Sequence, residues 1–274
     1  MEKRADLHIH THFSDSTSSP EEVVEEAHQQ NLSCIAITDH DVLEGILPAQ
    51  EAAKKYALEV LPGIELSTEY NGKDIHMLGY MFDTAHPDLR EHIRVSQNAR
   101  VERMGKMIAK LDALGHPGIQ LEEVCALTNS DAVGRPHLAQ VMVEKGIVSS
   151  LKEAFDKYIA EGAPACVPKF KITPFDAIKL IRAAGGVAVL AHPYITKVDE
   201  LIPQMVEAGL GGIEVFYPRT VEAERQHYLN LVKKHGLVAT GGSDAHGSAK
   251  KHTWVGNIQI PYTYVKQLKA AARG

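Results

Sequence analysis

Residues 34–40 read Cys-Ile-Ala-Ile-Thr-Asp-His, an apolar run that ends in three polar residues. A short apolar run of this kind is typical of a strand that is buried on both faces of a parallel sheet. Similar runs recur along the chain, and together with Cys34–Thr38 they form the predicted strands. The others are Asp6–His10, Glu59–Ile64, Asp74–Tyr80, Gly186–Ala191, Gly212–Phe216 and Leu237–Thr240.

Helical segments lie between these predicted strands. Pro20–Gln30 follows a serine that can cap a helix and has proline and two acidic residues in its first turn. Glu44–Tyr56 is a second helical segment. Alternating strands and helices imply a parallel sheet, and seven repeats indicate a closed or nearly closed barrel. We therefore expect an α/β fold, a seven-stranded (β/α) barrel.

One region interrupts the alternation and contains helical patterns without a convincing strand. These patterns are Asp88–Leu114, Leu121–Leu127, His137–Lys145 and Ser150–Ile159. We expect residues 1–86 and 169–274 to form the barrel, and residues 87–168 to form a small helical insertion that covers the active site.

Composition excludes several classes of protein. The chain has 274 residues, of which 44% are hydrophobic and 23% charged, as expected for a globular protein and not for a disordered one or a coiled coil. It contains no apolar run long enough for a membrane helix, and we expect no secretion signal and no membrane partner. The three cysteines, Cys34, Cys125 and Cys166, suit a reducing cytoplasm. A net charge of −6 argues against binding to long nucleic acids.

Histidines and acidic residues gather at the ends of the predicted strands. The chain contains 15 histidines. In a barrel, the carboxyl ends of the strands converge on one pocket, so side chains from six distant segments would meet there. The converging candidates are His8, His10, Asp15, His40, Glu65, His76, His192, Asp244 and His246.

Imidazole and carboxylate groups without thiolates are the ligands of zinc, manganese or iron in hydrolases. A single zinc ion needs three or four ligands, so this set suits two or three divalent ions. Other histidines, such as His92 and His227, are more simply surface or packing residues. Asp39 and Asp41 either orient the imidazole of His40 or belong to the turn after the strand.

At these positions the chain resembles the polymerase and histidinol phosphatase (PHP) superfamily. The resemblance rests on the motifs Asp6-Leu7-His8-Ile9-His10, Thr38-Asp39-His40, Pro62-Gly63-Ile64-Glu65, Ala191-His192-Pro193 and Gly242-Ser243-Asp244-Ala245-His246, which recur in order. It implies a distorted seven-stranded barrel with three metal ions that hydrolyses phosphoesters through a metal-bridging hydroxide. Ser16 stands where the similar members usually have glycine, and His12 stands at a position outside their ligand set.

The resemblance also implies a distribution of ligands. One ion would take His8, His10, Glu65 and Asp244, a second would take Glu65, His76 and His192, and a third would take Asp15, His40 and His246. Glu65 then bridges two ions, and Glu65, Asp244 and His192 are the expected catalytic residues.

The insertion narrows the resemblance. Val133-Gly134-Arg135-Pro136-His137 resembles the branch that acts on nucleoside 3′,5′-bisphosphates and on the 5′ ends of short RNA. Arg135, His137 and Lys169 are the expected substrate contacts, with Lys171 as a further candidate. Arg135 could instead cap a helix or form an interdomain ion pair, and the two lysines could be solvated.

Other functions remain open from the sequence. A histidinol-phosphate phosphatase or another small-molecule phosphatase would share every metal residue. A non-catalytic metal-binding PHP module is a second alternative, although it would be expected to lose ligands. An aldolase or amidohydrolase is a third, although no lysine ends a predicted strand. Metal identity and oligomeric state stay open.

Overall fold

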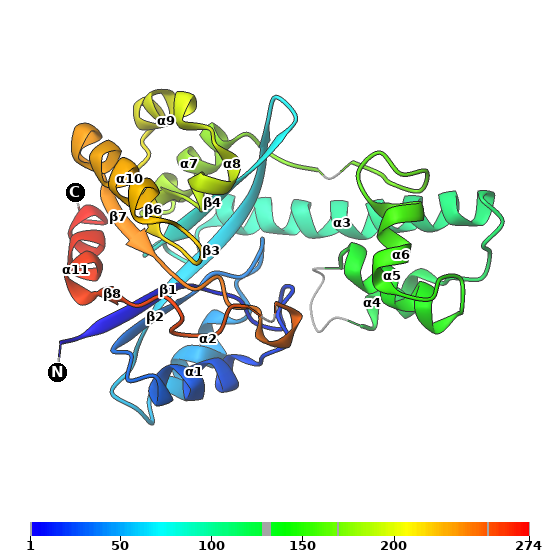
Figure 1. Ribbon diagram of the computed structural model, residues 1–274, viewed down its shortest axis with the longest axis horizontal. Helices are drawn as coiled ribbons and strands as arrows, with labels where there is room; N and C mark the ends of the chain where they lie inside the picture. The colour runs from blue at the N-terminus through cyan, green and yellow to red at the C-terminus, as the bar shows by residue number, and fades with distance from the viewer. Residues whose placement is uncertain (1, 128–132, 169, 251, 274) are drawn as a thin grey trace. The chain divides into compact units, whose positions relative to one another are not determined.

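The computed structural model describes residues 2–127, 133–168, 170–250 and 252–273 (Figure 1). The chain divides into two compact units. The first comprises Met1–Glu91 and Lys171–Gly274, and the second comprises His92–Phe170.

The first unit is built on one sheet with the strand order β7-β6-β5-β4-β3-β2-β1-β8. An isolated parallel bridge between Ile9 and Ala245 brings the segment after β7 beside the end of β1, which nearly closes the sheet into a barrel. The strands are β1 (Arg4–Ile9), β2 (Cys34–Ile37), β3 (Glu59–Tyr70), β4 (Lys73–Tyr80), β5 (Val187–Leu190), β6 (Gly212–Phe216), β7 (Val238–Gly241) and β8 (Ile260–Pro261). The expected α/β barrel is therefore confirmed, with an eighth short strand that pairs antiparallel with β1.

The expectation of a fully parallel sheet is wrong at β4. This strand pairs antiparallel with both β3 and β5. The reason is local: Asn71 and Gly72, at the turn between β3 and β4, have φ angles of 52° and 77°. Two consecutive positive φ angles at Asn-Gly are typical of a tight hairpin turn, which reverses the chain where a crossover helix would keep it parallel.

Helices follow most of the strands of the first unit. Ser19 caps α1 by accepting from the Glu22 backbone N–H at 3.2 Å, and Glu22 accepts in return from the Ser19 N–H at 2.7 Å. The helices are α1 (Pro20–Gln29), α2 (Ile46–Ala53), α7 (Pro174–Ala183), α8 (Pro193–Thr196), α9 (Ile202–Ala208), α10 (Glu222–His235) and α11 (Tyr262–Ala271), with short 3₁₀ turns at Asp199–Leu201 and Gly247–Ala249.

Apolar side chains fill the space between the sheet and α11. Leu7, Cys34, Leu78, Val189 and Leu268 are fully buried there. Tyr80 is also buried, and its hydroxyl donates to the Leu7 carbonyl at 2.7 Å, which ties β4 to β1 across the barrel. The core therefore holds the strand ends, and the side chains that they carry, in a fixed arrangement.

The second unit is helical and has its own core. Met104, Met107, Leu111, Leu138 and Met142 are among its buried residues. Its helices are α3 (Pro87–Ala113, which begins in the first unit), α4 (Leu121–Cys125), α5 (Arg135–Glu144) and α6 (Leu151–Ala154), followed by a π-helical turn at Phe155–Ile159. Within the described parts of the chain, no helix combines the length and apolar character that a membrane span requires.

Candidate metal centre

The predicted metal ligands come together at one end of the barrel. His8 lies on β1 and His10 directly after it, Glu65 lies on β3, and His192 is the second residue after β5. His76 lies near the start of β4, and because β4 runs antiparallel, its amino end shares the rim formed by the carboxyl ends of the parallel strands. The hairpin therefore places His76, a residue near the amino end of its strand, on the rim that carries the other predicted ligands.

Among the residues that the structure describes, three groups of donor atoms form within this cluster. Each group contains one donor atom per residue, and the atoms of a group all lie within 4.8 Å of one another. The groups are His10, Asp15, His40 and His246; His8, His10, Glu65 and Asp244; and His40, Glu65 and His76. Adjacent groups share residues, which is the geometry of a multinuclear centre.

Glu65 lies at the middle of the arrangement and is buried. Its Oε1 lies 2.8 Å from His76 Nδ1 and 3.1 Å from His192 Nε2. Its Oε2 lies 3.1 Å from His8 Nε2 and 3.2 Å from His10 Nε2. The two carboxylate oxygens thus face different histidines, as expected for a bridging carboxylate.

The oxygens of Asp244 also have different neighbours. Oδ1 lies 3.2 Å from His10 Nε2 and 3.5 Å from His8 Nε2. Oδ2 accepts from the Tyr217 hydroxyl at 2.6 Å and from Lys250 Nζ at 3.0 Å. Asp244 therefore turns one oxygen toward the histidines, while two outer side chains hold the other.

Glu214 on β6 is a residue of this site that sequence reasoning missed. Its Oε1 lies 2.8 Å from His8 Nδ1, and its Oε2 accepts from the backbone N–H of His192 at 2.8 Å. His192 has a φ of 27°, in the left-handed region, so this hydrogen bond also supports a strained backbone. The signal was present, because a glutamate in the middle of the otherwise apolar segment Gly-Ile-Glu-Val-Phe needs a buried partner.

A neighbouring glycine lets β1 approach the segment after β7. A Cβ atom added to Gly242 would lie 2.3 Å from the backbone nitrogen of His8, closer than any real contact. Asp6 on β1 binds the same segment, since its carboxylate accepts from the Ser243 N–H at 2.9 Å and from the Gly256 N–H at 2.8 Å. These contacts position His8 and Asp244 side by side.

The electrostatics of the cluster favour cations. Burial alone would lower the pKa of His10, but its hydrogen bonds to Asp244 and Glu65 outweigh burial and raise the pKa to about 9. Burial dominates at His40 and lowers its pKa to about 3. Burial alone would raise the pKa of Glu65, yet the neighbouring His40, His8 and His76 hold it well below its ordinary value. The carboxylates around His10 therefore favour a positive charge at this position.

Several imidazole nitrogens of this donor set are buried without a hydrogen-bond partner in the part of the chain that the structure describes, as expected if metal ions belong there. Among the described residues, His10 Nδ1, His40 Nδ1, His192 Nδ1 and His246 Nε2 are buried and lack a hydrogen-bond partner of acceptable geometry. His8 and His10 also point their Nε2 atoms at each other, 3.1 Å apart. Imidazole nitrogens and carboxylates facing one another in a buried site are the donors that divalent cations require, so the residues fit metal ions.

The grouping differs in detail from the distribution that the resemblance implied. His10 belongs to two groups and not to one, and His40 likewise joins both the Asp15 group and the Glu65–His76 group. His192 stands outside the three groups, although its Nε2 lies 3.1 Å from Glu65 Oε1. The cause is the central position of His10 and His40, whose ring centroids lie 4.7 Å apart.

Asp39 does not orient the imidazole of His40 through a hydrogen bond. Its carboxylate accepts from the Thr11 N–H at 2.7 Å, the Thr11 hydroxyl at 2.6 Å and the Ser14 hydroxyl at 2.6 Å. It therefore anchors the loop that carries Asp15. Asp41 accepts from the Ser67 N–H at 2.9 Å, which ties the end of β2 to β3.

The expected substrate contacts of the insertion make contacts within the second unit. Arg135 Nη1 donates to the Ile159 carbonyl at 3.3 Å, and its guanidinium lies 5.7 Å from the centre of the Phe155 ring. His137 Nδ1 accepts from the Gly134 N–H at 3.0 Å and so caps α5. Lys169 lies outside the described residues. Lys171, in the first unit, is paired with Asp74 and, at 3.3 Å, with Glu69.

Comparison with known proteins gives a family and close relatives. The PHP domain family matches residues 6–161. The 5′-3′ exoribonuclease Rnm of Escherichia coli is 35% identical over 248 residues, which cover 88% of this chain and 84% of that protein. The 3′,5′-nucleoside bisphosphate phosphatase of Chromobacterium violaceum is 31% identical over 259 residues, which cover 93% of this chain and 91% of that protein.

A solved structure agrees with these relatives. A protein from Bifidobacterium adolescentis, assigned as a metal-dependent phosphoesterase, superposes with a TM-score of 0.86 and 28% sequence identity, covering 97% of this chain and 96% of the other. The family match spans more than half of the chain, and the structural match spans nearly all of it. The resemblance read from the motifs is thereby confirmed, and this chain belongs to the PHP domain family.

Proposed function

We propose that this chain is a metal-dependent phosphoesterase that hydrolyses phosphate esters of nucleotides with two or three divalent ions. The observation that carries the proposal is the convergence of eight histidine and acidic side chains in three donor groups, which share His10, His40 and Glu65 pairwise. His192 joins them, with its Nε2 3.1 Å from Glu65 Oε1. Manganese, zinc and iron all accept such a set of nitrogen and oxygen donors.

The substrate class rests on the relatives. One is named for a 5′-3′ exoribonuclease activity and another for nucleoside 3′,5′-bisphosphates. Both names describe a phosphate ester on a ribose. We therefore assign to this chain the nucleoside 3′,5′-bisphosphates, and the 5′ ends of short RNA, as substrates.

The residues of the centre have two roles: some would bind the ions, and others hold those ligands in place. When bound, divalent ions lower the pKa of a water molecule and stabilise the negative charge of the phosphate oxygens. Glu65 holds two donor groups at a fixed separation because each of its oxygens faces different histidines. Tyr217 and Lys250 fix Asp244, and Glu214 fixes His8, so these ligands cannot rotate away when substrate enters.

Arg135 and His137, together with Lys169, are the proposed substrate contacts of the insertion. Burial lowers the pKa of the Arg103 guanidinium, and the nearby positive charges of Arg135 and Arg100 lower it further. Guanidinium groups gathered in this way favour an anionic ligand, which supports a phosphate contact for Arg135.

A substrate panel tests the proposal. The purified protein, loaded with manganese, zinc or iron, is offered adenosine 3′,5′-bisphosphate, a short RNA with a 5′ phosphate, and histidinol phosphate. We expect the highest kcat/KM for one of the two nucleotides. A preference for histidinol phosphate would support the alternative phosphatase, and no turnover with any metal would support a non-catalytic PHP module.

A further inference from the structure

A pocket lies in the first unit, and one of its lining residues, Tyr194, packs against Tyr217 of the proposed metal centre. Its volume is about 480 Å³, within the range of pockets that bind small molecules. Its walls come from the segments after β5 and β6, including α8, the 3₁₀ turn at Asp199–Leu201 and the first turns of α10. These segments leave the same end of the barrel as the metal-binding residues.

Contacts between aromatic rings connect this pocket to the metal centre. Tyr194 lines the pocket, and its ring lies 5.1 Å from that of Tyr217. The hydroxyl of Tyr217 donates to Asp244 at 2.6 Å. A substrate whose phosphate lies at Asp244 therefore has this pocket as a neighbouring space for the rest of the molecule.

The lining combines aromatic rings with a surplus of carboxylates. Among the lining residues, the carboxylates of Asp199, Glu200 and Glu224 outnumber the one lysine, Lys197, and the one histidine, His227. Glu200 also pairs with Lys73 at 3.7 Å, which leaves a surplus of one carboxylate over the two lysines. Such a surplus of negative charge repels a phosphate group. The pocket must therefore bind an uncharged or a cationic part of a ligand, and in a nucleotide that part is the base.

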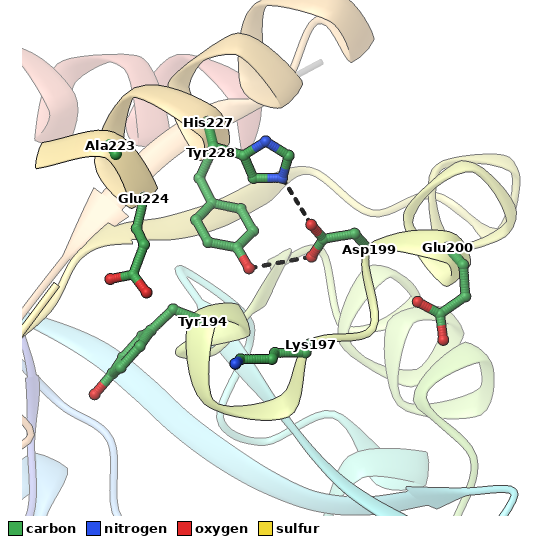
Figure 2. A pocket seen from close by; sticks show the side chains of 8 residues that line it. All are labelled: Tyr194, Lys197, Asp199, Glu200, Ala223, Glu224, His227 and Tyr228. Atoms are coloured by element: carbon green, nitrogen blue, oxygen red, sulfur yellow. Dashed lines mark hydrogen bonds and ion pairs between the residues drawn. The ribbon is translucent and has the colours of Figure 1, made fainter. Parts of the chain in front are cut away.

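Two charged groups in the pocket have hydrogen-bonding capacity to spare. Glu224 Oε2 accepts from the Val221 N–H at 3.0 Å, and no described residue donates to its Oε1. Lys197 Nζ makes no hydrogen bond or ion pair with the described residues, and it sits on a backbone with a φ of 48°. Figure 2 shows the Glu224 carboxylate next to the Tyr194 ring and the Lys197 side chain extending toward Tyr194 from the other side.

The opposite wall is held rigid by hydrogen bonds. Asp199 Oδ2 lies 2.7 Å from His227 Nε2, and its Oδ1 accepts from the Tyr228 hydroxyl at 3.1 Å (Figure 2). Tyr194 donates from its hydroxyl to the Pro218 carbonyl at 3.2 Å, which fixes the other ring. Rigid aromatic rings provide flat apolar surfaces on which a base can stack.

We propose that this pocket binds the base of the nucleotide and prefers a base that carries an exocyclic amino group. The inference rests on the proposed function and extends it to base specificity. The spare oxygen of Glu224 accepts from the amino group of cytosine, adenine or guanine, and Lys197 donates to a ring carbonyl oxygen. Uracil carries an oxygen where cytosine carries its amino group, so it places an acceptor against the carboxylate.

The test compares cytidine and uridine 3′,5′-bisphosphates with the metal-loaded enzyme. We expect the wild-type kcat/KM to favour cytidine by about tenfold or more, because an unpaired carboxylate opposes uracil. Glu224→Gln keeps an oxygen for the Val221 N–H and presents an amide donor to the base, so it should reduce or reverse this ratio. Glu222→Gln, on the same helix and outside the pocket, is the matched control and should keep the wild-type ratio.

A second variant tests the proposed contact between Lys197 and the carbonyl oxygen of the base. Lys197→Met should lower kcat/KM about tenfold for cytidine and guanosine substrates, and should change the adenosine substrate least, since adenine has no carbonyl oxygen. Inhibition by free cytidine, which has no phosphate, should weaken in both Glu224→Gln and Lys197→Met.

The outcomes separate the two proposals. Hydrolysis of nucleotides with equal kcat/KM for cytidine and uridine, or with a ratio that Glu224→Gln leaves unchanged, overturns the base pocket and leaves the proposed function standing. Failure to hydrolyse any nucleotide, with turnover of an amine-bearing phosphate instead, overturns both and identifies the pocket as a site for a cationic group.

Discussion

At the scale of single residues, Glu65 has the most consequential position. Glu65→Gln keeps the size of the side chain and removes the charge that faces five histidines, His8, His10, His40, His76 and His192. We expect it nearly to abolish hydrolysis, as measured by kcat/KM on the best nucleotide substrate. Glu69→Gln, exposed on the same strand, is the control. A loss of less than tenfold, about 1.4 kcal/mol in barrier, would contradict a bridging role.

Glu214 acts at the same scale, through other residues. Its carboxylate accepts from His8 Nδ1, which leaves Nε2 to face Glu65 and Asp244. In Glu214→Gln one of its two acceptor oxygens becomes a donor, so we expect metal affinity to fall by about 10- to 100-fold. Competition with a metal indicator measures the affinity, and ¹⁵N NMR of the His8 ring reports its tautomer. Unchanged affinity together with an unchanged tautomer would show that Glu214 only packs.

At the scale of elements, α11 is attached to β3 through Glu59. The Glu59 carboxylate accepts from the Tyr262 hydroxyl at 2.6 Å and is paired with Lys269. Burial alone would raise the pKa of Glu59, but the hydrogen bonds to Lys269 and Tyr262 lower it overall. A lowered pKa in the folded state stabilises the protein above the pKa of the unfolded state, and this stabilisation is lost as the pH falls.

Lys269→Met should therefore destabilise the protein more at neutral than at acidic pH. The difference in Tm between wild type and Lys269→Met should be largest near pH 7 and should shrink as Glu59 becomes protonated. Thermal unfolding followed by circular dichroism between pH 3 and pH 7 measures it. A difference in Tm that grows toward acidic pH would have the wrong sign for this interaction.

The first residue of α5 provides the prediction for the insertion. If Arg135 contacts the second phosphate of a bisphosphate, Arg135→Ala loses a charge-assisted contact of about 1.5–3 kcal/mol. The kcat/KM for a nucleoside 3′,5′-bisphosphate should then fall by about ten- to a hundredfold, and that for a monophosphate much less. Arg135→Lys keeps the charge without the bidentate geometry, so its kcat/KM for the bisphosphate should lie between those of the wild type and Arg135→Ala. Equal losses of kcat/KM on both substrates would contradict a contact between Arg135 and the second phosphate.

The elements themselves were largely predictable from the sequence. Seven strands and the helices between them follow from apolar runs and capping residues, which are local signals. The direction of β4 is also encoded locally, in Asn71-Gly72, although the alternation of strands and helices in the rest of the unit predicts a parallel strand. The two-residue strand β8 carried too little pattern to be recognised, since its pairing with Arg4 and Ala5 is formed only in the folded chain.

At the scale of the whole molecule, metal removal should separate activity from folding. A chelator should inactivate the enzyme while the barrel stays folded, because the core of the first unit is independent of the donor groups. Circular dichroism and activity, measured on the same sample, test this. Global unfolding by the chelator at room temperature would show that the ions are structural.

Restoring the metal gives a second measurement on the whole molecule. The carboxylates of Glu214, Glu65 and Asp244 outweigh burial and raise the pKa of His8 well above its ordinary value, and that of His10 is raised to about 9. Manganese binding near pH 7 should therefore release protons, and the apparent affinity should weaken as the pH falls. Calorimetry in buffers of different ionisation enthalpy counts the protons, and a count near zero would contradict the raised pKa values.

The sequence alone determined which side chains could form the centre. The predicted ligands on apolar strands, or in the short segments that follow them, include His8, His10, His40, Glu65, His192, Asp244 and His246. In a parallel barrel such positions converge. Fold class and ligand candidates are properties of local patterns, so they can be read without coordinates.

Only the tertiary structure decided how those side chains are shared. His10 and His40 each face two donor groups, and Glu214 reaches both His8 and the backbone of His192 from another strand. Such relations depend on which strands are neighbours, on their register and on the close contact at Gly242. These are distances between residues far apart in the chain, and no periodicity along the sequence records them, because they arise when the sheet curls until Ala245 lies beside Ile9.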